Sequence, residues 1–137
     1  MPTAIQTRPV TMYPLFRYRD PEAAFAWLGE AFGLEILEIS RDETGTAIHA
    51  ELSLGGSVIM ISPDTGDRPA GGTQEVYIAL DAVDALYERA RKAGAEIVRP
   101  IAEQPYGSRE FAARDLEGNT WHFGTNRPTV PEGDPAA

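Results

Sequence analysis

The feature that most constrains this chain is an internal repeat with a spacing of about 61 to 62 residues. A helix-glycine-strand pattern occurs as AFGLEIL at 31–37 and again as KAGAEIV at 92–98. A strand-turn-strand pattern occurs as ELSLGGSVIMI at 51–61 and as ARDLEGNTWHF at 113–123. This spacing is longer than that of the common solenoid repeats. It predicts a duplicated βαβββ unit, in which one helix covers one face of a four-stranded sheet and the other face meets a partner or a ligand.

The first unit contains the residue types expected at the ends of a helix. Asp20 is a good N-cap, Pro21 suits the first helical position, and Gly33 suits a left-handed helix end. Residues 47–54 alternate between apolar and polar, which is typical of a half-buried antiparallel strand, and Gly55-Gly56 indicates a hairpin turn. The predicted elements are strand 12–18, helix 23–32, and strands 34–41, 47–54 and 57–62.

The second unit repeats this order. Its predicted elements are strand 74–80, helix 81–92, and strands 95–99, 108–114 and 120–124. Segments rich in Pro and Gly separate them, with a linker or mobile loop at 63–73 and a loop at 100–107. We therefore predict an α+β fold in a single domain over 1–137. Module one covers about 11–62, the linker 63–72, module two about 73–125 and a frayed tail 126–137, after an untethered lead-in over 1–10.

Composition excludes several classes of function. The chain has 137 residues and no cysteine, so it has no disulfide, no thiolate metal site and no cysteine nucleophile. Its net charge of −9 disfavours binding to nucleic acid. No apolar run reaches the length of a membrane span, and the first residues lack the pattern of a secretory signal, so we expect a cytoplasmic protein that binds neither nucleic acid nor membrane. Serine-hydrolase, P-loop and dinucleotide-binding motifs are also missing.

Four segments together resemble a known superfamily: YRDPEAAFAWLGEAFGLE (18–35), HAELSLGGSVIM (49–60), DAVDALYERARKAGAEIVRP (81–100) and YGSREFAARDLEGNTWHFGT (106–125). They resemble the vicinal-oxygen-chelate superfamily of glyoxalases, bleomycin resistance proteins and dioxygenases, and are most similar to its PhnB-like members. The run RDLEGNTWHF is the most specific part. The resemblance implies two tandem βαβββ modules that form a curved mixed sheet around a cleft, with the helices outside. It also implies a homodimer in which the second subunit completes the cleft.

The resemblance implies a divalent metal where the family carries out chemistry, held by four inward positions on the first and last strands of each module. In this sequence those positions fall on Tyr13, Met60, Glu75 and His122. Tyrosine and methionine are poor ligands for a hard or borderline cation. We therefore favour no metal and no other cofactor. If a divalent metal does bind, Glu75 and His122 would hold it with His49 or Glu51.

Alternation along the strands predicts which side chains face the cleft. Both histidines and two glutamates fall on that face, together with aromatic and cationic groups, and Leu15, Val58 and Thr120 fall there too. Trp121 falls on the opposite, helix-covered face with Phe16, Ala50, Leu52, Ile59 and Phe123. The ten residues that we predict to bind a ligand are Tyr13, Arg17, His49, Glu51, Met60, Glu75, Tyr77, Arg109, Phe111 and His122.

Each group of these residues has two interpretations. The His and Glu residues form either a non-standard metal site or a hydrogen-bonded polar cleft or dimer contact. The aromatic residues and Met60 form either a wall for a flat ligand or part of a core or interface. Arg17 and Arg109 bind either an anionic ligand or Glu51 and Glu75. Tyr106-Gly107 is either a lid or a turn.

Three functions follow. The first, which we favour, is a metal-free binding protein that sequesters a small, partly aromatic molecule. The second is a metal-dependent lyase, isomerase or dioxygenase that uses His49, Glu51, Glu75 and His122 in some combination. The third is an accessory module whose open sheet face is a dimer contact. Measuring metal binding separates the first two, because only the second requires stoichiometric metal for turnover.

Overall fold

Module one contains one helix and a four-stranded mixed sheet. The structure is a computed structural model that describes residues 10–68, 70 and 74–131. Its first elements are β1 (Leu15–Tyr18), α1 (Pro21–Phe32), β2 (Glu35–Arg41), β3 (Ala47–Leu54) and β4 (Ser57–Pro63). The strand order is β1-β4-β3-β2, with β1 parallel to β4 and the other pairs antiparallel. The predicted helix signals act as expected, because Asp20 accepts a hydrogen bond from the backbone of Ala23 and Gly33 adopts φ 78°.

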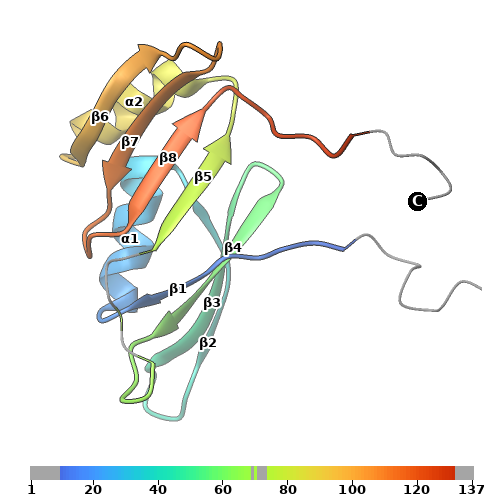
Figure 1. Ribbon diagram of the computed structural model, residues 1–137. Coiled ribbons are helices and arrows are strands. Elements are labelled where there is room, and N and C mark those ends of the chain that lie inside the picture. The colour runs from blue at the N-terminus through green and yellow to red at the C-terminus, as the bar shows by residue number, and fades with distance from the viewer. Residues whose placement is uncertain (1–9, 69, 71–73, 132–137) are drawn as a thin grey trace, which may run out of the picture.

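Module two repeats this arrangement. Its elements are β5 (Glu75–Ala79), α2 (Val83–Lys92), β6 (Glu96–Glu103), β7 (Arg109–Arg114) and β8 (Thr120–Gly124). The strand order is β5-β8-β7-β6, again with the first pair parallel. Figure 1 shows the two four-stranded sheets as separate units. The prediction of two tandem βαβββ modules in an α+β fold is therefore confirmed.

Two strands differ from their predicted limits by three residues or more, and both differences involve a proline. β1 begins at Leu15 instead of Met12, directly after Pro14, which has no backbone N–H to donate to a neighbouring strand. β6 continues through Pro100 to Glu103, where the sequence predicted a loop. Since β6 is an edge strand with register shifts on both sides of Arg99, it accommodates a proline.

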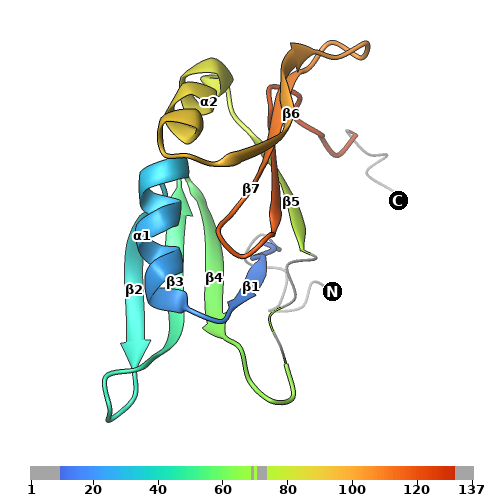
Figure 2. The ribbon, with the colours of Figure 1, turned by 90° about the vertical axis from the view of Figure 1, so that its left-hand side faces the viewer.

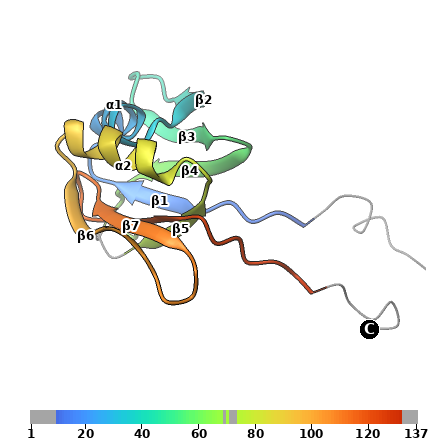
Figure 3. The ribbon, with the colours of Figure 1, turned by 90° about the horizontal axis from the view of Figure 1, so that it is seen from above.

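Each helix covers one face of its own sheet, and the two helices also contact each other (Figure 2). We call the face of each sheet that its helix leaves uncovered the open face. Seen from above, residues 10–14 and 125–131 run away from the sheets on the same side (Figure 3).

Within the described residues, no helix is long and apolar enough to cross a membrane. The predictions for residues 1–9, 69, 71–73 and 132–137, which include most of the lead-in and part of the linker, lie outside the described residues.

A chain of aromatic rings joins the helix-covered faces of the two modules. Trp121 of β8 stacks on Phe16 of β1 with ring centroids 5.0 Å apart, and lies 5.2 Å from Phe32 of α1. Phe32 also meets Phe123 edge-on at 4.9 Å, and Phe123 stacks on Phe111 at 5.0 Å. All five rings are essentially buried, so the prediction that Trp121 belongs to the core is confirmed. Such rings contribute both buried area and favourable ring geometry.

The run RDLEGN, the most specific part of the sequence, forms a buried hydrogen-bond network between the modules. We call this network around Asp115 the lock. The Asp115 carboxylate accepts hydrogen bonds from the Tyr18 hydroxyl, from Trp121 Nε1 at 3.0 Å and from Asn119 Nδ2 at 3.1 Å. Burial, followed by the charge of Asp115, raises the pKa of Tyr18 well above its ordinary value, so this hydroxyl stays protonated and donates. Nearby, exposed Glu117 accepts from the backbone N–H groups of Arg19 and Asp20. The motif is therefore explained by its structural role.

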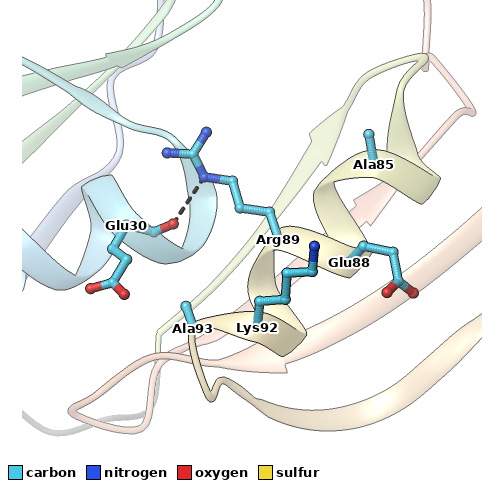
Figure 4. A pocket seen from close by; sticks show the side chains of 6 residues that line it. All are labelled: Glu30, Ala85, Glu88, Arg89, Lys92 and Ala93. Carbon is cyan, nitrogen blue, oxygen red and sulfur yellow. Dashed lines mark hydrogen bonds between the residues drawn. The ribbon is translucent and has the colours of Figure 1, made fainter.

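One arginine of α2 links the two helices through hydrogen bonds at the C-terminal end of α1. Arg89 of α2 donates to the backbone oxygen of Glu30 at 2.9 Å (Figure 4). It also donates to the backbone oxygen of Gly29 at 2.8 Å, and its guanidinium lies against Gly33. These carbonyls are among the last of α1, where unpaired acceptors and the helix dipole favour a cation. The shallow hollow around Arg89 contains both acidic and basic side chains, and we attribute to it a structural role.

Replacing Arg89 with alanine is expected to lower the free energy of unfolding by about 1 kcal/mol, because two carbonyl groups lose a charged donor, although the Gly29 oxygen keeps its hydrogen bond from the backbone of Gly33. Urea denaturation measures this change. Arg91→Ala is the matched control. It removes an exposed ion pair to Glu88 and a contact between the guanidinium and the Tyr87 ring, and a loss of about 0.5 kcal/mol or less is expected. Equal losses in the two variants would contradict the helix-end role of Arg89.

Candidate functional site

Four of the predicted ligand-binding residues lie on the open face of sheet one. Phe16, Ala50, Leu52 and Ile59, which alternate with them, are buried under α1. The strand register places Met60 beside Glu51 and Leu15. His49 Nε2 lies 3.4 Å from Glu51 Oε2, and Arg17 donates to the backbone oxygen of Pro63 at 3.2 Å instead of pairing with a glutamate. The face is thus polar, with one His–Glu pair and apolar neighbours.

Three further predicted residues lie on the open face of sheet two. His122 Nε2 of β8 lies 2.7 Å from Glu75 Oε1 of β5. The Tyr77 hydroxyl donates to the backbone oxygen of Asn126 at 2.7 Å, which fixes the ring across the end of β8. Each sheet therefore carries its own His–Glu pair. The chain does not bring the four residues into one cluster.

The predictions for Arg109 and Phe111 are wrong, because the alternation in β7 has the opposite phase. Phe111 is fully buried on the helix-covered face, where it contacts Phe123 and Tyr87. Arg109 points the same way and forms an ion pair with Asp84 of α2 at 2.8 Å. This hydrogen bond from Arg109 lowers the pKa of the Asp84 carboxyl. Neither side chain reaches the open face, so neither is available to a ligand there.

The corrected phase of β7 brings Glu110 to the open face, a residue that we did not predict. Only 4% of it is exposed, and its Oε1 accepts from the Tyr106 hydroxyl at 2.6 Å and from Arg99 at 3.1 Å. Burial would raise the pKa of Glu110, but the hydrogen bonds from Tyr106, Ser108 and Arg99 outweigh it and hold the pKa below its usual value. The missed signal was in β7 itself: placing Phe111 in the core would have turned Glu110 outward.

Gly124 provides the space that lets Tyr77 and Glu110 approach each other. A Cβ at this position would lie 2.6 Å from both the Tyr77 hydroxyl oxygen and Glu110 Cγ. Gly124→Ala is therefore expected to displace both side chains and to destabilise the fold by about 1–3 kcal/mol through overpacking. Gly56→Ala is the matched control in urea denaturation, because a Cβ there meets nothing within 4 Å and little change is expected. Similar losses in both variants would refute this packing role.

A cleft of about 760 Å³ lies between residues 11–14, the β3–β4 hairpin and β5. We call it the inter-module cleft. Tyr13, which precedes β1 and is half exposed, and Tyr77 are the predicted site residues that line it. An Arg127–Asp81 ion pair at 3.5 Å supplies charge at its wall. Its apolar and aromatic lining includes Met12, Leu54, Val58, Val76, Ile78 and Trp121. A concave, mainly apolar space with few polar groups is typical of small-molecule sites.

The residues at the four implied metal positions do not fit a metal ion. Glu75 and His122 are bonded to each other, while Tyr13 and Met60 belong to the other module. Neither a phenol nor a thioether is a good ligand for a hard cation. Across residues 10–68, 70 and 74–131, no three His, Cys, Asp or Glu side chains are close enough together to hold a metal.

Comparisons with known proteins agree with this fold. The family model described as "Glyoxalase/Bleomycin resistance protein/Dioxygenase superfamily" matches residues 11–123. The solved structure of TioX from Micromonospora sp. ML1 is similar, with 34% identity, a TM-score of 0.73, and coverage of 88% of this chain and 99% of TioX.

Two further proteins are similar at lower identity. The bleomycin resistance determinant encoded on the transposon Tn5 has 18% identity and a TM-score of 0.68, with coverage of 88% of this chain and all of that one, which shows the fold alone. An uncharacterized protein of Mycobacterium tuberculosis is 28% identical over 117 residues, which are 77% of this chain and 68% of the relative. From the extent of the family match and the identity to TioX, the chain belongs to the glyoxalase/bleomycin resistance protein/dioxygenase superfamily.

Proposed function

We propose that this protein binds and sequesters a small, partly aromatic molecule without a metal ion. The observation that carries the proposal is the inter-module cleft, which has the volume of a small-molecule site and an apolar, aromatic lining. Tyr13 and Tyr77 are aromatic lining residues against which a flat ligand would pack, and the Arg127–Asp81 pair would supply polar contacts. The similar Tn5 protein is by its name a resistance determinant for bleomycin, which is consistent with a binding role for this fold.

The donor set on the open faces supports the metal-free form of the proposal. Each His–Glu pair is satisfied by its own hydrogen bond, and the two pairs belong to different modules. Purified protein is expected to show no stoichiometric binding of nickel, manganese, zinc or iron(II), and His122→Ala is expected to give the same result. Calorimetric titration measures this. Stoichiometric sub-micromolar binding that is lost in the variant would overturn the metal-free form.

Ligand binding is tested by a thermal-shift screen of aromatic natural products in the presence of EDTA, followed by calorimetry of the hits. A hit is expected to lose at least about tenfold in affinity in Val58→Trp, because an indole at that position fills the cleft. Leu37→Ala, on an exposed strand position outside the cleft, is the matched control and should bind normally. Hits whose affinity is unchanged in Val58→Trp, or a screen that yields no hits, would count against the proposed function.

We also propose that the chain is a homodimer in the cytoplasm. The lead-in to sheet one exposes several large apolar side chains together: Val10 and Met12 are 90% and 89% exposed, and Tyr13 and Leu15 are about half exposed. A second copy that covers this segment would remove apolar surface from water and help to close the cleft. Sedimentation velocity is expected to show a dimer that Met12→Asp weakens, and a monomer at high concentration would contradict this.

A further inference from the structure

The most unusual polar group of the open faces is the carboxylate of Glu110. It is 4% exposed on a face where Glu75 and Tyr77 are open to solvent. Its Oε1 accepts from both Tyr106 and Arg99, and Gly124 lies across from it in β8. A buried carboxylate is costly unless it is well bonded, and neither the fold nor the proposed cleft requires one at this position.

Tyr106 reaches this carboxylate from the solvent side. It lies in the turn between β6 and β7, closed by a hydrogen bond from Gly107 N to the Gln104 backbone oxygen at 2.9 Å. The residue is 65% exposed, yet its hydroxyl donates to a nearly inaccessible oxygen at 2.6 Å. The hydrogen bond to Glu110 raises the pKa of Tyr106, which keeps the phenol protonated. The contact is thus a neutral phenol, presented on an exposed ring, that binds a buried carboxylate.

The charges around Glu110 indicate what else could bind there. The guanidinium of Arg99 lies 3.1 Å away and balances the carboxylate, so the site has no net charge that would favour a cation. An anion would meet the carboxylate directly. A neutral O–H donor is the group that fits, because hydrogen bonds from O–H to a carboxylate are short and strong. Of Tyr106 and Arg99, which both donate to this carboxylate, Tyr106 is the more exposed, so its position is the one that the hydroxyl group of a ligand can take.

We propose that Glu110 anchors an aromatic hydroxyl group of the bound ligand, and that Tyr106 occupies this position when no ligand is present. The expected ligand is a neutral phenol or a hydroxylated fused ring. The Tyr106 side chain, itself a phenol, already makes this contact within the chain. This inference deepens the proposed function and rests on it. Tyr77, which packs beside Glu110 over Gly124 and also lines the inter-module cleft, joins the anchor to the volume that would hold the rest of the ligand.

The test uses two probes of nearly equal shape, 2-naphthol and 2-methoxynaphthalene, of which only the first can donate. Each is titrated into ¹⁵N-labelled full-length protein, and shifts of the backbone amides of Glu110, Gly107 and Gly124 report binding. The expected dissociation constant for 2-naphthol is at least about tenfold lower than for 2-methoxynaphthalene, because the ether would displace Tyr106 without donating a hydrogen bond in its place. Glu110→Leu is expected to bring the two constants together.

A second variant separates ligand recognition from a structural role. Tyr106→Phe removes the competing phenol, and 2-naphthol is expected to bind it at least about threefold more tightly than it binds the unmodified chain. A merely structural bond would give no such gain. Glu96→Leu is the matched control, because Glu96 also pairs with an arginine on sheet two but is exposed, and its probe ratio should be unchanged. Should Glu110→Leu fold poorly, Glu110→Gln is expected to lose at least about threefold in affinity for 2-naphthol.

Equal affinities for the two probes, no amide shift with 2-naphthol, or no gain in Tyr106→Phe would each overturn the assignment of Glu110. The proposed function is tested separately, by the natural-product screen and by the affinity of its hits for Val58→Trp. If the screen yields ligands but the two naphthalene probes bind equally well, only the proposed role of Glu110 is refuted. A screen that fails removes the binding function itself.

Discussion

Replacing Asp115 with alanine is expected to lower the free energy of unfolding by about 4 kcal/mol, among the largest effects of any single substitution in this chain. The change deletes one carboxylate and leaves four buried donors without a partner: the Tyr18 hydroxyl, the Trp121 indole N–H, and both the side-chain amide and the backbone N–H of Asn119. Each buried donor that loses its partner costs about 1–3 kcal/mol, and part of this is recovered if the turn opens to water. Urea denaturation followed by tryptophan fluorescence measures the loss.

Glu117→Gln is the control for this experiment. Glu117 lies in the same turn and also links the modules, but its two backbone donors are exposed and water can replace it, so a loss below about 1 kcal/mol is expected. If Asp115→Ala does not fold, Tyr18→Phe still tests the lock. It removes one donor and leaves the others bonded, and about 1–1.5 kcal/mol should be lost. The lock would be refuted if Asp115→Ala were as stable as Glu117→Gln.

Phe32→Ala is expected to cost about 3–5 kcal/mol, because it opens a cavity where α1 meets both sheets. The ring of Phe32 contacts Trp27 of its own helix and both Trp121 and Phe123 of β8. Its loss weakens the contact between the modules, so the urea transition is also expected to broaden as the modules cease to unfold together. Leu37→Ala, at a half-exposed position of β2, is the control and should cost less than about 1 kcal/mol. A small loss with an unchanged transition would contradict this role.

The sequence predicts the architecture well because the relevant signals are local. Asp20, Pro21 and Gly33 mark the ends of α1, which begins two residues before the predicted helix 23–32 and ends where predicted. The alternation in β3 correctly separates His49 and Glu51 from Ala50 and Leu52. The duplication supplies the topology of the second module from that of the first. Trp121 could be assigned to the core for the same reason, since the alternation in β8 is unambiguous.

The site is predicted less well, because it depends on contacts between segments distant in sequence. In β7 the run REFAAR offers an arginine and a phenylalanine in one phase and a glutamate and an alanine in the other. Alternation alone cannot choose between them, and the contacts of Phe111 with Tyr87 and Phe123 decide the phase. Likewise, both His residues lie on open faces, but only the arrangement of the modules shows that they belong to separate pairs.

The aromatic contacts between the modules also govern the order in which the chain can fold during synthesis. Phe16 and Phe32 are made early, but their partners Trp121 and Phe123 are more than eighty residues further along the chain. A nascent chain that ends after β4 therefore exposes two aromatic rings and a Tyr18 hydroxyl that only the last hairpin can cover. Contacts of such long range slow folding and leave apolar surface exposed to aggregation. Module one is thus expected to be insoluble when expressed alone, even though its secondary structure is locally well specified.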